Sequence, residues 1–165
     1  MRNPDSASTH KKVVVLLLNH VPVKGYLNPA RLGRIDKIDL LTSGGEHLSI
    51  NIEDTKAVYF VREFADPFEP ERKTFLSRPK LDGLWVRLVF RDEDVMEGIV
   101  SNNLVDLLDS GVRLTPPDLN GNTLHMFVPR SALVEMKVLG VVGGSRRQAR
   151  APRAAVGAQS KLFGE

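Results

Sequence analysis

The chain has 165 residues, of which 42% are hydrophobic and none is cysteine, and its formal net charge is +3. The absence of cysteine excludes disulfides, thiolate nucleophiles and thiolate metal sites, and no apolar run approaches the ~20 residues of a membrane-spanning helix. The composition is typical of a globular protein, with a cytoplasmic location as the expectation.

The positive charge belongs to the two ends of the chain. Residues 143–165 carry five Lys or Arg and one acid, and residues 1–12 carry three and one. Residues 13–142 carry 15 bases and 18 acids, so the central body is slightly acidic. Tight binding to a phosphate backbone needs clustered Lys and Arg, which argues against the central body as a nucleic-acid surface.

Two stretches of the chain resemble each other. Residues 13–25, VVVLLLNHVPVKG, align with residues 86–98, VRLVFRDEDVMEG, at an offset of 73. The similarity continues at an offset of 74, which places Leu40 on Leu114, and then at an offset of 76, which places Leu48 on Leu124 and Val58 on Val134. Because runs, turns and gaps follow in the same order, we predict a duplicated unit.

The first unit is predicted over residues 13–64, after a polar segment, residues 1–12, that is expected to be disordered. Its opening run is continuously apolar, which is typical of a strand buried on both faces. Gly25 inside the second strand predicts a bend or bulge. Five strands are predicted, at residues 13–18, 23–28, 36–43, 46–52 and 57–64, with helical turns at residues 28–33 and 53–56.

The second unit is predicted over residues 84–140 and repeats this order. Its counterpart of the first helical turn, residues 101–111, is longer and is expected to bury Leu104, Leu107 and Leu108. We interpret this segment either as a lid over the open end of a barrel or as the place of a function specific to this copy. Five strands with a helical turn before the fifth are the order of an SH3-like barrel. The predicted fold is therefore mainly all-β, with two such barrels in tandem and short helical turns.

Two segments lie outside the repeats. Residues 65–83 carry three prolines, many charges and the large apolar side chains of Phe68, Phe75 and Leu76. They are predicted to form an ordered linker across both units with the phenylalanines packed inward. Residues 141–165 are rich in Ala, Gly and Arg and are expected to be a disordered basic tail.

Motifs for catalysis or metal binding are not recognised in the sequence. It has neither a phosphate-binding loop nor a nucleophile elbow, and its four histidines are isolated from one another. The acidic group at Asp92, Glu93, Asp94 and Glu97 lacks the ligand spacing of a calcium loop and is interpreted as solvated hairpin charge. We predict no catalytic residue, no metal site and no cofactor, and hence a protein that is not an enzyme.

The basic tail is the one candidate for contact with nucleic acid or another anion. Its candidate residues are Arg146, Arg147, Arg150 and Arg153. Clustered arginines of this kind suit an arm that touches nucleic acid or anionic lipid. Few aromatic side chains are available there for base stacking, so a solubilising tail remains the alternative.

Four stretches of the first unit, VVVLLLNHVPVKGYL, DKIDLLTS, HLSINI and AVYFV, resemble the strand pattern of Sm-like barrels of the Hfq kind. Residues 86–140 follow the pattern more weakly. Sm-like proteins are rings that bind RNA through a lysine-histidine pair before the last strand, and residues 53–56 and 129–131 do not hold that pair. The chain is also similar to uncharacterised bacterial proteins with two such copies, which implies a bacterial origin and a fold without a defined activity.

A comparison with the PilZ barrel, which binds cyclic dinucleotides, is weaker. Arg72 and Arg78 do not have the spacing of that family's paired arginines, and residues 118–121 lack the serine of its strand motif. The sequence thus favours a non-catalytic bacterial binding or adaptor module that acts in regulation through a protein or peptide partner. RNA or DNA binding through the tail, and PilZ-like nucleotide sensing, are the alternatives, and the oligomeric state is left open.

Overall fold

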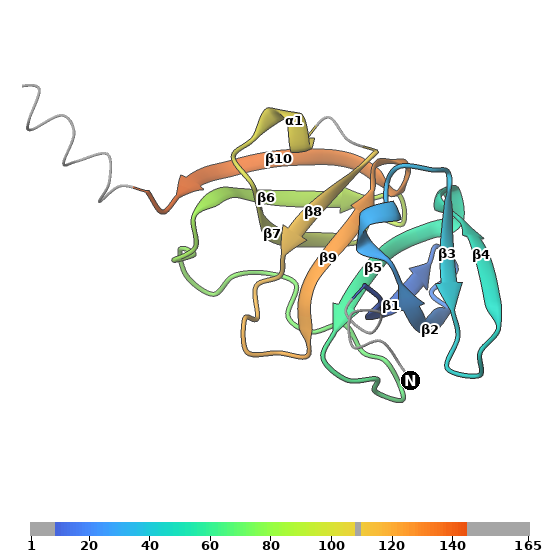
Figure 1. The fold of residues 1–165 in the computed structure, drawn as a ribbon. Helices are drawn as coiled ribbons and strands as arrows, with labels where there is room; N and C mark the ends of the chain where they lie inside the picture. The colour runs from blue at the N-terminus through green and yellow to red at the C-terminus, as the bar shows by residue number, and fades with distance from the viewer. Residues whose placement is uncertain (1–8, 108–109, 145–165) are drawn as a thin grey trace, which may run out of the picture.

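The fold is a single antiparallel sheet of ten strands that does not close on itself (Figure 1). The computed structural model describes residues 9–107 and 110–144. The mainly β class predicted from the sequence is confirmed, and so are the short helical turns. The strands are β1 (Lys11–Leu17), β2 (Pro22–Leu27), β3 (Lys37–Leu41), β4 (His47–Asn51), β5 (Thr55–Val61), β6 (Gly83–Phe90), β7 (Val95–Val100), β8 (Gly111–Thr115), β9 (Thr123–Pro129) and β10 (Leu133–Val142). The helical turns are η2 (Pro29–Arg31), η3 (Ile52–Asp54), α1 (Leu104–Leu107) and η4 (Arg130–Ala132).

The two halves of the chain have the same strand order. The sheet runs β10-β6-β7-β8-β9-β5-β1-β2-β3-β4, so each half reads 5-1-2-3-4 when its strands are numbered from its own start. The halves meet where β9, the fourth strand of the second half, pairs with β5, the fifth strand of the first. A shared topology of this kind supports the predicted duplication.

The strand pairing corrects one part of the predicted alignment. Leu40 pairs with Leu48 in the first half, and Leu114 pairs with Met126 in the second. Met126 is therefore the structural counterpart of Leu48, at an offset of 78 rather than 76. The same offset relates β5 to β10, so that Val58 corresponds to Met136 and not to Val134. The predicted offset was wrong because the stretch from Leu114 to Met126 is longer by four residues than the stretch from Leu40 to Leu48, and not by two.

The ends of the repeats also differ slightly from the predicted bounds. β1 begins at Lys11, because Lys11 and Lys12 extend the pairing with β2 through Leu27 and Tyr26. These two residues are therefore ordered, in contrast to the predicted disorder of residues 1–12. At the other end β10 continues to Val142, two residues past the predicted end of the second unit.

The buried core has two clusters that share strands β1 and β5. Val13 and Val15 belong to the cluster of the first half, whereas Val14 and Leu16, which alternate with them, belong to the cluster of the second half. Strand β5 divides its side chains in the same way and is buried along its whole length. The continuous apolar run of β1 thus reflects burial on both faces, as predicted.

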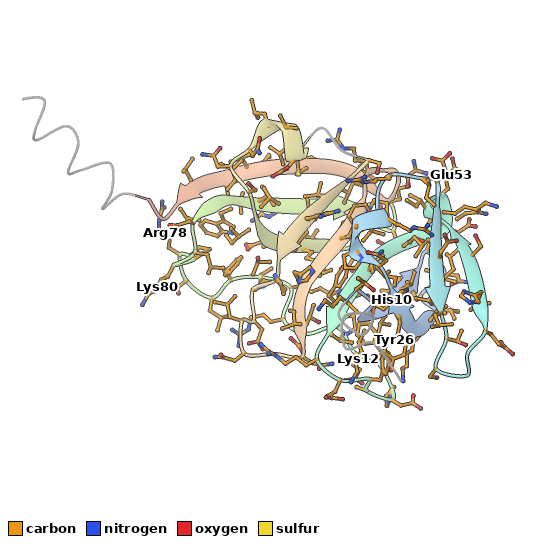
Figure 2. All side chains as sticks on the ribbon, in the orientation of Figure 1. His10, Lys12, Tyr26, Glu53, Arg78 and Lys80 are labelled. Atoms are coloured by element: carbon orange, nitrogen blue, oxygen red, sulfur yellow. The ribbon has the colours of Figure 1, made fainter. Side chains whose placement is uncertain are left out.

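The linker packs Phe68 against the second core and Phe75 against Trp85 of β6. Phe68 contacts Tyr59 edge-on at 5.0 Å between ring centroids, and Phe75 contacts Trp85 at 6.2 Å. Leu76 is 81% exposed and packs against neither cluster. Figure 2 shows Arg78 beside the end of β10, where its guanidinium donates to the Val141 carbonyl at 2.8 Å.

Glycine is required at one equivalent position in each half. A Cβ added to Gly25 would lie 2.6 Å from Leu40 Cγ and 2.7 Å from the Leu41 carbonyl oxygen, and a Cβ on Gly98 would lie 2.5 Å from Leu114 Cδ1. The predicted irregularity at Gly25 is therefore a close approach of β3 to β2, in a stretch of regular pairing between β1 and β2.

Gly25→Ala is expected to lower the free energy of unfolding by about 1–3 kcal/mol, because the added methyl group forces β2 and β3 apart. Urea denaturation followed by circular dichroism measures the change. Gly140→Ala is the matched control, since its Cβ would meet nothing closer than Trp85 Cε3 at 4.0 Å. Equal stability losses for both variants would show that the close approach at Gly25 has no energetic weight.

Candidate functional site: the free edges of the sheet

Strand β10 forms one end of the sheet, and the described part of the chain provides no strand on its outer side. Its ten residues carry four exposed large apolar side chains, those of Val134, Met136, Val138 and Val141. An edge strand presents unpaired backbone N–H and C=O groups, and natural proteins usually protect a long apolar edge. β10 is therefore a candidate for accepting another strand.

The equivalent strand of the first half shows what such an edge looks like when it is covered. Val58 and Phe60 of β5 correspond to Met136 and Val138 of β10. The first two pair with Val15 and Val13 of β1, and the last two pair with the counterparts of those residues, Leu88 and Val86 of β6. Val58 and Phe60 are buried, whereas Met136 is 37% and Val138 is 52% exposed. The exposure of β10 thus arises because no strand of the described residues pairs with its outer side.

The cover of β5 is strand β9 of the second half. Phe127 of β9 pairs with Val58 and is itself part of the first-half core cluster. His125 pairs with Phe60, and the two rings stack with centroids 4.2 Å apart. Partial burial, together with the positive charge of Arg113, lowers the pKa of His125 and so favours the neutral form of the stacked ring. We call this β5–β9 contact the internal junction.

Strand β4 forms the opposite end of the sheet and is the counterpart of β9. Leu48 is 39% exposed, whereas its counterpart Met126 is 1% exposed inside the internal junction. His47 and its counterpart His125 are both exposed, so the two strands differ at Leu48 and Met126. The sheet thus ends in one fifth strand, β10, and one fourth strand, β4, and the internal junction pairs a fifth strand, β5, with a fourth strand, β9.

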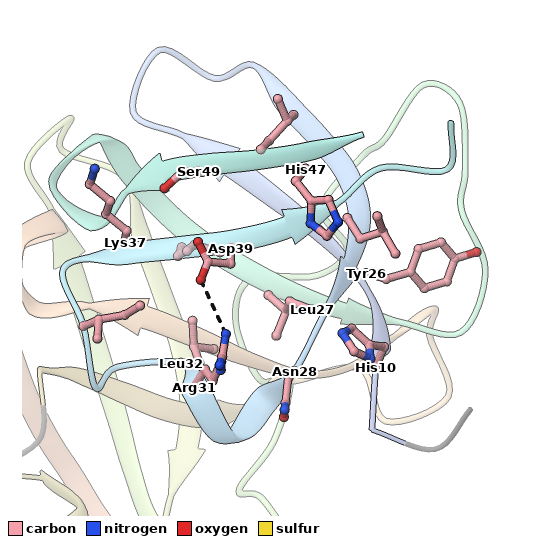
Figure 3. A pocket seen from close by; sticks show the side chains of 14 residues that line it. His10, Tyr26, Leu27, Asn28, Arg31, Leu32, Lys37, Asp39, His47 and Ser49 are labelled. Atoms are coloured by element: carbon pink, nitrogen blue, oxygen red, sulfur yellow. Dashed lines mark ion pairs between the residues drawn. The ribbon is translucent and has the colours of Figure 1, made fainter. Parts of the chain in front are cut away.

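A pocket lies beside β4, over β2, β3 and η2 (Figure 3). We call it the β4 pocket; its volume is about 500 Å³. Apolar side chains supply much of its lining, including Tyr26, Leu27, Leu32, Ile35, Leu41 and Leu48. Arg31 and Asp39 face each other across it, with Arg31 Nη1 3.8 Å from Asp39 Oδ2, and both remain largely exposed.

The equivalent pocket of the second half is bordered by the first half. Val100, Val112 and Arg113, the counterparts of Leu27, Ile38 and Asp39, line a pocket of about 400 Å³ together with residues 30 and 32–34 of the first half. The Ser110 hydroxyl donates to the Gly33 carbonyl there at 2.7 Å. The internal junction is therefore accompanied by a second contact between the halves, in which a turn of the first half borders the pocket of the second.

The counterpart of that turn in the second half is α1 with the residues before it. Burial of Leu104 was predicted, but Leu104 is 74% and its neighbour Val105 is 71% exposed, because nothing in the described part of the chain packs over them. Leu107 is half-buried against the second core, as predicted, and Leu108 lies outside the described residues. The turn thus presents two apolar side chains to solvent.

The acidic hairpin between β6 and β7 is more than solvated charge. Lys56, buried at the start of β5, donates to Asp92 at 2.7 Å and to Asp94 at 2.9 Å, and Lys73 of the linker also binds Asp94, at 2.8 Å. His20 Nε2 lies 3.3 Å from Asp92 Oδ2. These contacts connect both halves and the linker in one charge cluster. The cluster was not predicted from the sequence, because every other member lies at least 17 residues from Lys56 along the chain.

The cluster shifts the pKa of each partner toward its charged form. Burial alone would raise the pKa of Asp94 and lower that of Lys56. The hydrogen bonds and opposite charges outweigh this effect, so the pKa of Asp94 is lowered and the pKa of Lys56 is raised. The pKa of Asp92 is lowered in the same way by Lys56, against the effect of its own burial. The cluster is suited to holding the two halves together as fixed charges.

The remaining candidate residues do not gather into a reactive site within the described ranges. His10 and His47 line the β4 pocket, and His20 and His125 lie elsewhere. Among residues 9–107 and 110–144 no group of three or more His, Asp or Glu could hold a metal ion. The tail residues Arg146, Arg147, Arg150 and Arg153 lie outside the described residues. No helix of the described part is both long and apolar enough to cross a membrane.

Residues 9–140 match the sequence model of a family described as a family of unknown function, DUF6982. Because the match spans most of the chain, the protein belongs to this family. No curated protein and no solved structure matches the chain.

Phe127→Ala is expected to lower the free energy of unfolding by about 3–5 kcal/mol, because it removes a buried ring that joins the second half to the first core. Urea denaturation followed by the fluorescence of Trp85 and by circular dichroism should give one coincident transition at a lower midpoint. Leu124→Ala on the same strand is the control. Leu124 is exposed, so this substitution should change the free energy of unfolding little. Separate transitions for the two probes in the wild type would contradict a junction that unites the halves.

Lys56→Met is expected to cost about 1–3 kcal/mol, because it leaves Asp92 and Asp94 partly buried without their shared partner. The lowered carboxyl pKa values mean that stability is present above the ordinary value of 3.8 and is lost as pH falls below it. The raised pKa of Lys56 adds stability that is lost only above pH 10.5.

Chemical denaturation between pH 2 and pH 7 tests this assignment. The acid loss of stability should shrink in Lys56→Met and persist in Lys12→Met, whose ion pair with Glu63 is solvent-exposed. An unchanged acid profile in Lys56→Met would refute the role of the cluster.

Proposed function

We propose that the protein is a non-catalytic binding module that accepts an extended segment of a partner protein along β10. The observation that carries the proposal is the exposure of Met136 and Val138, whose counterparts Val58 and Phe60 are buried by a paired strand. A strand added to an open sheet edge gains backbone hydrogen bonds along its length, and its alternate side chains give specificity.

The charge distribution supports a protein or peptide partner over a nucleic acid. β10 carries one acid and one base, Glu135 and Lys137, between its apolar side chains. Counterion release from phosphate contacts needs a basic surface, which β10 does not offer. The strongest cluster of titratable groups in the described ranges, around Lys56, is internally paired and connects structural elements. These features favour a role in binding rather than catalysis.

In its finer form the proposal describes each half as a small barrel unit of the SH3-like or Sm-like kind, in which the fourth and fifth strands carry the contacts to neighbours. The repeated 5-1-2-3-4 order and the helical turn before each fifth strand support this description. We further propose that the protein acts as a regulatory adaptor in the bacterial cytoplasm.

Selection of phage-displayed random peptides against the full chain tests the function. Peptides with alternating apolar residues should be enriched, and their affinity should fall tenfold or more in Val138→Lys, because a charge on the edge opposes strand addition. Val21→Lys is the control, since Val21 is exposed in the turn between β1 and β2, away from the free edges.

Two results would contradict the proposal. One is equal binding of the selected peptides to wild type and Val138→Lys, which would place the site elsewhere. The other is a chain that captures no peptide but binds single-stranded RNA with a steep dependence on salt, which would identify a nucleic-acid-binding protein.

A further inference from the structure

We propose that the partner strand on β10 is β4 of a second copy of this chain, and that the two copies meet as the two halves meet at the internal junction. The inference deepens the proposed function and rests on it, because it names the occupant of the same edge. Strand β10 is the counterpart of β5, and β4 is the counterpart of β9. Both free ends of the sheet are therefore unfinished forms of a contact that the chain already makes internally.

The strand pair predicts a definite register between copies. At the internal junction Val58 pairs with Phe127, Tyr59 with Met126 and Phe60 with His125. Replacing each residue by its counterpart at the offset of 78 pairs Met136 with Ser49, Lys137 with Leu48 and Val138 with His47. The contact would cover Val138 and Leu48, which are exposed in a single copy. It would also remove both unpaired edges of a single copy, which are aggregation-prone when left open.

The turn and the pocket give a second, independent match. Within one chain the first-half turn, residues 30 and 32–34, forms one wall of the second-half pocket and accepts a hydrogen bond from Ser110 at Gly33. Between copies the counterpart turn carries exposed Leu104 and Val105, and the counterpart pocket is the β4 pocket, whose lining includes the apolar side chains of Leu27, Leu32 and Ile35 beside polar ones. In both contacts the half that supplies the fifth strand also supplies the turn, and the half that supplies the fourth strand also supplies the pocket. One rigid placement of the second copy would therefore satisfy both contacts.

The contact is heterologous, because β10 of one copy meets β4 of the next. Such an interface leaves one free β10 and one free β4 on every open assembly, so it repeats until a ring closes or a filament grows. A contact between two β10 edges would instead stop at a dimer. The two arrangements give opposite results when the edges are blocked one at a time.

Sedimentation velocity of the full chain over a wide concentration series tests the inference. The wild type should form assemblies larger than a dimer. Leu48→Lys blocks β4, Val138→Lys blocks β10, and each variant alone should sediment as a monomer. An equimolar mixture of the two should form a dimer and nothing larger, because one intact β10 and one intact β4 remain. Val21→Lys is the control and should assemble as the wild type does.

Disulfide cross-linking checks the register, since the chain has no cysteine of its own. Residues opposite each other on antiparallel strands lie within the Cα separation that a disulfide can bridge. A chain with Val138→Cys should cross-link under mild oxidation to a chain with His47→Cys. It should not cross-link to a chain with Val21→Cys.

Several outcomes would overturn the inference. They are a wild type that stays monomeric, a Leu48→Lys variant that dimerises alone, and a mixture of the blocked variants that gains no mass. Titration of a selected peptide into Leu48→Lys, whose β10 is intact, separates this failure from that of the proposed function. Peptide binding in a chain that does not self-associate leaves the proposed function standing and refutes the second copy as the partner. If the chain neither binds peptide nor self-associates, both the proposed function and the second copy as the partner are refuted.

Discussion

The pairing of β5 with β9 is the contact on which the rest of the structure depends. It converts two five-stranded halves into one sheet and buries β5 along its whole length. Phe127 crosses from the second half into the first core, while Tyr59 and Val61 of β5 belong to the second core. Neither half would keep its core intact without the other, because each core includes side chains supplied by its neighbour.

The same contact explains what is left exposed. Two repeated units joined head to tail leave one fourth strand and one fifth strand without a partner, and within residues 9–107 and 110–144 these are β4 and β10. The apolar side chains of Val138 and Leu48 lie at these ends because the pattern of the repeat is retained where the neighbour is absent. Exposed edges of this kind are interaction sites when they are not protected, which is why both proposals are placed there.

The mainly β class of the fold was predictable from features that act over short distances. The continuous run of β1 indicated burial on both faces, because hydrophobic periodicity is local. The bend or bulge predicted at Gly25 was wrong, since the glycine is required by the close approach of β3 within regular pairing. The alignment failed at the turn between β8 and β9, where inserted residues change the offset and coincidental matches such as Leu48 with Leu124 suggest a wrong register. Strand pairing between the halves fixes the offset, and that pairing is not visible in periodicity.

The candidate site was harder to predict for the same reason. Arg146 and its neighbours stood out by composition, whereas the exposure of Met136 depends on which strand ends the sheet. The charge cluster joins Lys56 of the first half to Asp92 and Asp94 of the second. In the sequence each of these residues resembles an ordinary surface charge. Leu104 was expected inside because its spacing matched a buried turn, and only the fold shows that its neighbour is missing.

Hydrogen-deuterium exchange of the full chain, read by residue at low concentration, tests the central claim most directly. If the β5–β9 pairing holds the halves together, amides of β5 and β9 at the junction should exchange only through global unfolding, while outward amides of β4 and β10 exchange much faster. The opposite result, with β5 and β9 amides exchanging as fast as those at the free edges, would show that the halves separate readily and would contradict this account.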